Sequence, residues 1–425
     1  MTWQPERTSI NQKVQLGVES LTALGTPVAA NKLIEAWDWT FAINADVTAY
    51  GATGRKYDLV QEENTEWVDI AVGGPLDYNN TPYLLAGAMG SVAPASHGSS
   101  SVAKDWIYNP PVSGSIVPQT FTLQQGDAVR AHQTAYSLIN SFGYVLTRKE
   151  AKLTAKGITQ PISDGITPTS SPTAVALAPV LGKQINIYLD STSAGLGTTQ
   201  LLKTLQFDFT FDGVYGPFWP INRSNVGFTA HVDLKPKTTC KLKLEADAAG
   251  MAMLPYLQQG TTYWLRVNAQ GIVIDNNQTV TLGAQSSGTF TLTYKGQTTT
   301  TIAYNAASSA VQTAFLALST VGAGNATVSG SAGGPYTIAF IGALATDTTA
   351  VTGTFTALTT PGNASITQTQ AYNAFQHDMA VKFGKPTAFS DDSGIFAIEW
   401  EGLIVEDPTW GKAQTVTLTN LITAL

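Results

Sequence analysis

Charged side chains are scarce in this 425-residue chain. Asp, Glu, Lys and Arg together make up 12% of its residues, about half of the roughly 25% that is usual for soluble domains. Such a surface is unusual for a free monomer, which normally stays soluble through interspersed Lys and Glu. Assembly that covers much of the surface would explain the composition. A Thr-rich, secreted all-β module would explain it equally well, and composition does not separate the two.

Cysteine is almost absent, since Cys240 is the only one. A single cysteine excludes an intrachain disulfide and a cysteine-based metal cluster. The residues around Cys240 predict a strand, in which a small thiol is expected to be buried and unreactive rather than functional.

Long apolar runs are also missing. Residues Met1 to Arg7 lack the apolar core and cleavage site of a secretory signal. No stretch approaches the roughly 20 apolar residues that cross a bilayer. We therefore expect synthesis in the cytoplasm and no membrane-spanning segment.

The excess of negative charge argues against a protein that binds nucleic acid tightly. The chain has 30 acidic and 23 basic residues, a net charge of −7. Proteins that grip nucleic acid need clustered Lys and Arg against the phosphates. The charge does not argue against a protein that nucleic acid slides past.

Motifs for catalysis and metal binding are missing as well. The histidines His97, His132, His231 and His377 are scattered, without a partner at metal-ligand spacing. There is no Gly-x-Ser-x-Gly elbow, no phosphate-binding loop and no dinucleotide fingerprint. Residues Asp391 to Gly394 are typical of a turn more than of a cation site. We expect no enzyme activity, no cofactor and no metal.

What the chain has in abundance is strand alternation. Apolar and polar residues alternate in several segments, which is typical of half-buried antiparallel strands. The apolar members are Leu205, Phe207, Phe209 and Phe211; Ile185, Ile187 and Leu189; Leu242 and Leu244; Phe396, Ile398 and Trp400; and Val416 and Leu418. Two such sheets packed face to face would bury these side chains. The sequence thus predicts a mainly β fold, a sandwich or small barrel.

Two short helices are predicted. One covers Tyr83–Met89 after Thr81 and Pro82, and Gly90 would end it. The other covers Ser308–Leu318, where apolar residues recur at helical spacing.

The second helix belongs to a segment of different composition. Residues 285–361 are rich in Thr, Ala and Gly, with Lys295 and Asp347 as the charged exceptions. Strands are predicted at Thr289–Tyr294, Thr299–Tyr304, Ala326–Gly330 and Tyr336–Ile341, on either side of the helix. This order predicts a small ββαββ module of the α+β type. We expect it to be inserted into a discontinuous main domain made of residues 1–284 and 362–425.

Several strings resemble the major tail tube proteins of long-tailed, non-contractile (siphovirus-type) bacteriophages. The first is Gln15 to Val28, with the family's Gly-x-Glu and Gly-Thr elements at Gly17, Glu19, Gly25 and Thr26, followed by a first strand at Leu33–Ile43. Further strings lie at residues 77–90, 135–150, 187–199 and 402–420, and each string alone is loose. Their order and spacing make the match, which covers most of residues 10–280 and 380–425.

The inserted segment resembles a repeat-type module of actinobacteriophage virion proteins. The resemblance runs from Gly288 to Thr337 and departs from the family pattern after Ile341.

The resemblance implies a structural virion protein of the tail that assembles in the host bacterial cytoplasm. Subunits would form sixfold rings that stack into a tube for DNA, with tape measure, tail tip and terminator proteins as further partners. Closing strands between subunits removes exposed sheet edges, and head-to-tail contacts give filaments. The module is expected on the outer wall because an open lumen leaves it no room inside, and host surface glycans are a candidate ligand for it.

Four acidic residues are candidates for the lumen of such a tube. Duplex DNA carries one negative charge per about 1.7 Å, so a conduit should be acidic or neutral. The candidates are Glu62, Glu63, Glu66 and Asp69. The alternative interpretation is that they are ordinary solvated charges.

The tryptophans are expected in the core or at subunit contacts, with glycan stacking as the alternative. Those considered are Trp37, Trp39, Trp67, Trp106, Trp264 and Trp400. The competing functions are a bacterial surface carbohydrate-binding or adhesion protein, a secreted glycoside hydrolase and another virion protein. The absent secretion signal and the absent carboxylate motif disfavour the first two.

Overall fold

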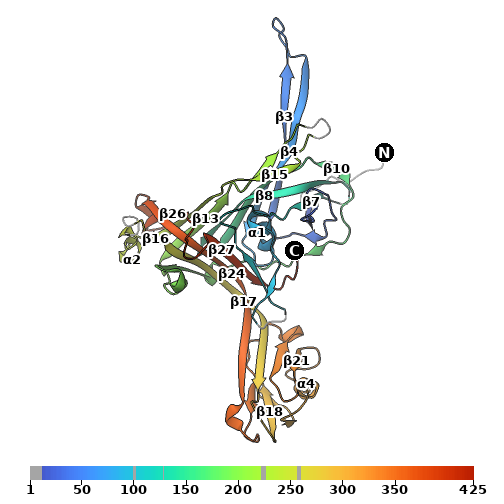
Figure 1. Ribbon diagram of the computed structural model, residues 1–425, viewed down its shortest axis with the longest axis vertical. Coiled ribbons are helices and arrows are strands. Elements are labelled where there is room, and N and C mark those ends of the chain that lie inside the picture. Colours follow the sequence, from blue (N-terminus) through green and yellow to red (C-terminus); the bar gives the residue numbers. More distant parts are fainter. Residues whose placement is uncertain (1–11, 99–101, 128, 222–225, 256–259) are drawn as a thin grey trace.

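The computed structural model describes residues 12–98, 102–127, 129–221, 226–255 and 260–425. The protein is mainly β, as the sequence predicts, and its large sheets form an elongated body (Figure 1). A two-stranded hairpin projects from one end of this body, and a smaller lobe extends in the opposite direction.

The body is built on a curved antiparallel sheet of ten strands. In spatial order these are β3 (Asp38–Tyr50), β4 (Val60–Pro75), β9 (Ala151–Thr159), β8 (Ala131–Thr147), β13 (Thr204–Asp212), β16 (Lys237–Glu245), β26 (Ile395–Ile404), β24 (Ser365–Pro386), β17 (Tyr263–Thr281) and β12 (Ile185–Asp190).

Shorter strands branch from this sheet and cover its inner face. Along β24, β27 (Gln414–Asn420) is followed by β6 (Lys104–Tyr108) and β5 (Ala95–Ser96). The first half of β8 joins β10 (Ser163–Ile166) and β7 (Phe121–Gly126), and β7 continues to β1 (Lys13–Val18), β2 (Lys32–Leu33) and β11 (Thr173–Ala174). The remaining body strands are β14 (Tyr215–Phe218), β15 (Ala230–Asp233) and β25 (Ser390–Asp392).

The predicted alternation accounts for the core of the body. On β13, Phe207, Phe209 and Phe211 are buried while the residues between them face outward. On the neighbouring β16, Cys240 is 1% exposed, and burial raises the pKa of its thiol to about 12. Cys240 is therefore a buried core residue, as expected.

Two predicted strands differ from the structure. Phe396 was expected in the core but is 59% exposed. The register of β26 is unbroken, but Phe396 lies beyond the end of its pairing with β16, whose last residue, Glu245, pairs with Ala397. The strand expected at Leu33–Ile43 is broken between β2 and β3. At this break the Trp37 ring packs against Gly74, where a Cβ would lie 2.8 Å from it.

The first predicted helix is α1 (Thr81–Met89), and all nine of its residues are buried. A helix that is apolar on every side belongs in a core, and α1 lies inside the body (Figure 1). Asp77 stabilises the turn before it by accepting bonds from the backbone N–H of Asn79 and of Asn80, at 2.9 and 2.8 Å. Gly90 ends the helix with φ 104°. A short helix that was not predicted, α2 (Ala248–Met251), follows β16.

The Gly-x-Glu string has a structural role at the centre of the body. The buried Glu19 carboxylate accepts bonds from the backbone N–H of Gly25 (2.8 Å) and Tyr136 (2.9 Å). It also accepts bonds from the hydroxyls of Thr120 (2.7 Å) and Thr122 (3.0 Å). Four donors around one carboxylate tie the segment after β1 to β7 and β8.

The smaller lobe (residues 276–370), called the lobe from here on, has its own hydrophobic core, separate from that of the body. It contains β18 (Thr289–Tyr294), β19 (Gln297–Thr298), β20 (Ile302–Ala303), α4 (Ser308–Leu316), β21 (Ala326–Gly330), β22 (Tyr336–Phe340) and β23 (Thr352–Thr354). The ends of β17 and β24 run out of the body into the lobe, and β22 pairs with Asn277–Val280 of β17.

The strand predicted at Thr299–Tyr304 is wrong in extent, because only Ile302–Ala303 and Gln297–Thr298 pair with β18. Between them the Thr299 hydroxyl accepts the backbone N–H of Leu292 at 3.1 Å. The backbone N–H of Thr299 still donates to Leu292 O at 2.8 Å, so the hydroxyl replaces only one of the two backbone bonds of this pair.

Candidate assembly surfaces

The hairpin of β3 and β4 leaves the body and continues into solvent (Figure 1). Its base is held by the backbone bond from Glu66 N–H to Val226 O at 3.0 Å and by the edge of Trp67 against Trp219. We call residues 43–66 the arm. Beyond its base, the arm has no strand partner elsewhere in the described chain, and β3 and β4 pair only with each other there. Isolated two-stranded hairpins are marginally stable at best.

One face of the arm carries an apolar stripe that continues from the core. Trp39 is buried and Phe41 half-buried, whereas Ile43 is 63% exposed and Val47 42% exposed. These alternate residues of β3 point to one face. The same stripe that packs in the body is therefore bare along the arm.

The four acidic candidates for a lumen do not share one face. A bulge at Asn64 breaks the register between Asp46 and Val47, so β4 gains one residue there. Glu63 and Glu66 consequently lie on the face of the apolar stripe. Glu62 and Asp69 lie on the opposite face, which continues the outer surface of the body sheet.

The environments of these four carboxylates also differ. Partial burial raises the pKa of Glu66, and the nearby Glu63 carboxylate raises it further. Asp69 accepts a bond from the Asn44 side chain at 2.8 Å. Glu62 and Glu63 are exposed on the arm.

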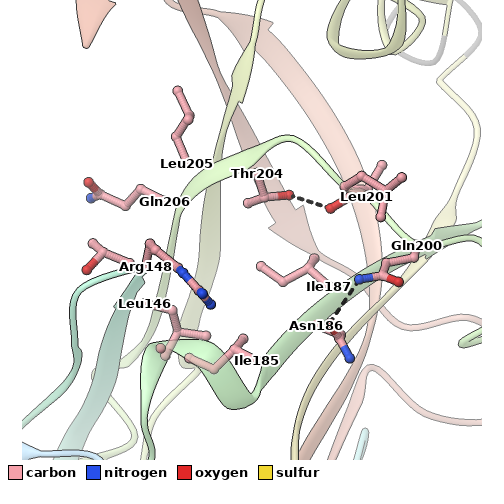
Figure 2. A pocket seen from close by; sticks show the side chains of 13 residues that line it. Leu146, Arg148, Ile185, Asn186, Ile187, Gln200, Leu201, Thr204, Leu205 and Gln206 are labelled. Atoms are coloured by element: carbon pink, nitrogen blue, oxygen red, sulfur yellow. Dashed lines mark hydrogen bonds between the residues drawn. The ribbon is translucent and has the colours of Figure 1, made fainter. Parts of the chain in front are cut away.

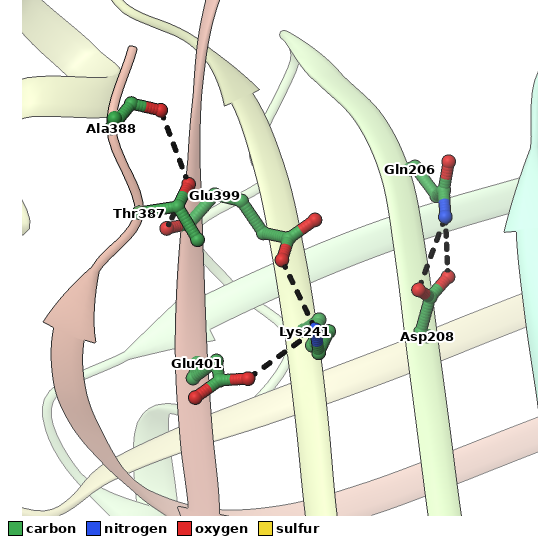
Figure 3. A network of polar contacts seen from close by, with 7 residues as sticks. All are labelled: Gln206, Asp208, Lys241, Thr387, Ala388, Glu399 and Glu401. Carbon is green, nitrogen blue, oxygen red and sulfur yellow. Dashed lines mark hydrogen bonds and ion pairs between the residues drawn. The ribbon is translucent and has the colours of Figure 1, made fainter. Parts of the chain in front are cut away.

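The outer face of the body sheet carries charges of both signs. Register places Asp208, Lys241 and Glu401 side by side on β13, β16 and β26. The Lys241 ammonium lies 3.3 Å from Glu401 and 3.3 Å from Glu399 (Figure 3), and these two carboxylates raise its pKa. Burial raises the pKa of Asp208, which accepts a bond from Gln206 at 2.8 Å. Sequence reasoning missed this face, although strand alternation places these residues opposite the core.

A pocket of about 310 Å³ opens between the end of β8, β12 and residues 200–206 (Figure 2). Its floor includes Leu146, Ile185 and Leu205, and Arg148 is the single charged side chain in its lining. Gln200 donates to the Asn186 side chain at 2.9 Å on the rim. The lining offers no acid–base pair for catalysis.

The tryptophans divide as expected between core and partly exposed sites. Trp37, Trp39, Trp106 and Trp400 are buried in the body. Trp67 and Trp264 are half-buried. Stacking on a glycan would need a ring face open to solvent, and the four buried rings do not provide one.

The four histidines remain apart in the fold. His377 is fully buried, His97 pairs with Asp105 at 2.8 Å, and His231 lies 3.1 Å from the Tyr136 hydroxyl. In the part of the chain that the structure describes, no three His, Cys, Asp or Glu side chains gather as a metal site would require. Asp391 accepts the backbone N–H of Gly394 at 3.0 Å, which is the turn that the sequence predicts.

Polar side chains of β17 attach the lobe to its stalk. Asn276 donates to Asp347 O at 2.6 Å, and Gln278 donates to Thr349 O at 2.9 Å. The lobe exposes no large hydrophobic side chain among its described residues. Its surface is therefore polar and almost uncharged.

No protein-family profile and no curated protein matches this chain. Solved structures that match include a chain from Mycobacterium phage Patience, with 11% sequence identity, a TM-score of 0.18, and coverage of 52% of this chain and 75% of that chain. A TM-score this low supports no conclusion about this protein. Among the described residues, no helix has the length and apolar character needed to cross a membrane.

Proposed function

We propose that this protein is a structural subunit that polymerises into the tail tube of a long-tailed bacteriophage. Copies associate into rings, the rings stack, and DNA passes through the lumen. The subunit carries out no chemical reaction, and it acts in the virion after assembly in the host cytoplasm. The proposal joins the family resemblance of the sequence with one structural observation, the arm.

The arm supports the proposal because it exposes two kinds of surface through which copies of a chain can associate. It exposes Ile43 and Val47 on one face, and the outer edge of β3 has no strand partner among the described residues, which leaves N–H and C=O groups for another chain. An exposed strand edge is a template for another chain. A contact between the arm and a different surface of the next copy is head-to-tail, and such contacts build rings or filaments.

The outer face of the body sheet suits a conduit for DNA. Its lysines are partly neutralised, since Lys241 lies between Glu399 and Glu401. Proteins bind DNA phosphates through lysines and arginines that displace counterions from the DNA. Lysines that are already paired with carboxylates do this weakly, so DNA is not held by such a surface. We propose that this face lines the lumen, in which case Glu62 and Asp69 point toward DNA and Glu63 and Glu66 do not.

The lobe then lies on the outside of the tube. In Figure 1 it extends away from the body on the stalk formed by β17 and β24. Its polar surface allows either a reinforcing role in the wall or contact with host glycans. Loss of host binding after removal of the lobe would support glycan contact, and unchanged binding would leave reinforcement.

Electron microscopy of the purified, concentrated protein tests the proposal. We expect hollow tubes or stacked rings of uniform diameter. A variant in which a two-residue turn replaces residues 45–65 should stay folded but monomeric, and Leu202→Ser serves as a control on an exposed residue outside the arm. A protein that stays monomeric at every concentration, also when mixed with tail tips, would overturn the proposal and direct attention to glycan binding.

A further inference from the structure

Two aromatic rings form an exposed apolar patch on the hairpin of β25 and β26. Phe389 and Phe396 stack with ring centroids 4.8 Å apart and an interplanar angle of 19°. They are 50% and 59% exposed, and the adjacent Ile395 is 39% exposed. Exposed side chains of this size that cluster on one surface mark an interaction site more often than scattered ones do.

We propose that the Phe389–Phe396 patch is the surface that receives the arm of a second copy of this chain. This inference rests on the proposed function, because it names the two surfaces that meet when copies polymerise. Ile43 and Val47 of one copy would pack against Phe389 and Phe396 of the next.

The position of the two surfaces supports a contact between copies. β3 is the first strand of the body sheet, and the β25–β26 hairpin branches from its seventh strand, so the two do not meet within one copy. Figure 1 shows the arm and the end of β26 at separate extremities of the molecule. If the arm of each copy bound the patch of the next, one repeated contact would cover both surfaces in every copy. Such a contact between two different surfaces is a head-to-tail interface.

Charges of both signs lie near the patch. Lys385, four residues before Phe389, is exposed and has no ion pair among the described residues. Asp391 is also exposed and lies directly opposite Phe396 on β25. Glu63 and Glu66 lie on the arm face that carries Ile43 and Val47. In the contact that we propose, these arm carboxylates would lie on the side of Lys385 and away from Asp391.

Engineered cysteines test the contact directly. Cys240 is buried and does not interfere. A variant with Val47→Cys and Phe396→Cys should give a ladder of disulfide-linked chains under mild oxidation at tube-forming concentration. A matched variant with Val47→Cys and Leu202→Cys should not give one, because Leu202 is more exposed than Phe396 but lies on another surface.

Loss of the aromatic rings provides a second readout. The double variant Phe389→Ser and Phe396→Ser should keep the melting temperature of the wild type, since both rings are solvent-exposed in the single copy. The protein concentration needed for tubes should rise about tenfold or more, which corresponds to a loss of about 1.4 kcal/mol or more, because the contact no longer buries either ring.

The outcomes separate this inference from the proposed function. If wild-type protein forms tubes but the cysteine pair gives no ladder and the serine variant polymerises normally, the patch is not the receiving surface and the tube function stands. If the wild type does not polymerise under any condition, both fall. A ladder together with the raised concentration supports both.

Discussion

The hydroxyl of Tyr144 lies 2.8 Å from Nδ1 of His377 in the middle of the body core. On the other side of the ring, Nε2 lies 3.0 Å from the Gln414 side-chain oxygen. An amide oxygen only accepts, so Nε2 carries the proton and Nδ1 accepts from the tyrosine. Burial of the neutral imidazole lowers the pKa of His377 to about 3.

Acid should therefore destabilise the body through His377. The unfolded chain binds a proton at His377 below about pH 6.5 and the folded chain does not, so the free energy of unfolding falls as pH drops. From pH 6.5 to 5 the expected loss is about 2 kcal/mol. Denaturant titrations of wild type and His377→Gln at several pH values measure it. A variant that keeps the full wild-type pH dependence would contradict the assignment.

Glu19 should be essential to the N-terminal half of the body. Glu19→Gln replaces one of the two acceptor oxygens by an amide NH2 group. This group would face either the donors of Gly25 and Thr120 or those of Tyr136 and Thr122. We expect the free energy of unfolding to fall by about 3 kcal/mol. The control Glu35→Gln, at an exposed carboxylate, should change it by less than about 0.5 kcal/mol. Equal effects of the two substitutions would refute the role given to Glu19.

Substitution of Asp347 should destabilise the lobe more than substitution of Lys295, although the two side chains form one ion pair. Burial opposes ionisation of Asp347, but bonds from Lys295 and Thr349 outweigh it, and the pKa of Asp347 is lowered. Asp347 also accepts the backbone N–H of Thr349 at 2.8 Å. Asp347→Asn should therefore destabilise the lobe by about 1–2 kcal/mol.

The partner substitution provides the comparison. The Lys295 side chain is 40% exposed, and pairs open to solvent contribute little. Lys295→Gln should cost less than about 1 kcal/mol. Thermal unfolding of both variants decides the point, and a larger loss from the lysine change would show that the charge pair dominates.

The body should fold without the lobe. Their hydrophobic cores share no residue, and β17 pairs with β24 on the body side of the lobe at Asp275 and Ala371. A short glycine-containing turn in place of residues 276–370 should leave a cooperative unfolding transition in calorimetry. A variant that is insoluble or lacks this transition would show that the lobe stabilises the body. The same variant also tests whether tubes form without the lobe.

Local patterns in the sequence were sufficient for much of the fold. Period-two alternation predicted the buried faces of β12, β13, β16 and β27, because side chains on a strand point alternately to its two faces. The helical spacing of Val311 and Phe315 predicted α4, and Gly90 predicted the end of α1. The mainly β class and the distinct composition of residues 285–361 were also readable without coordinates.

Other features depend on contacts between distant segments. The sequence did not predict β24, the 22-residue strand that links body and lobe, because its buried positions include polar residues such as Asn373 and His377. His377, for example, is satisfied by Tyr144 and Gln414, of which Tyr144 is far away in the chain.

The candidate assembly surfaces also depend partly on local sequence and partly on tertiary contacts. The acidic residues of the arm are visible in the sequence, yet the bulge at Asn64 decides which pair shares a face, and register is a property of two paired strands. Phe396 is exposed where β26 extends beyond the end of β16, and periodicity does not reveal where the neighbouring strand ends. The sequence by itself therefore determined which residues alternate and where elements end. Only the tertiary structure decided which faces meet solvent, because exposure depends on the segments that pack against each face.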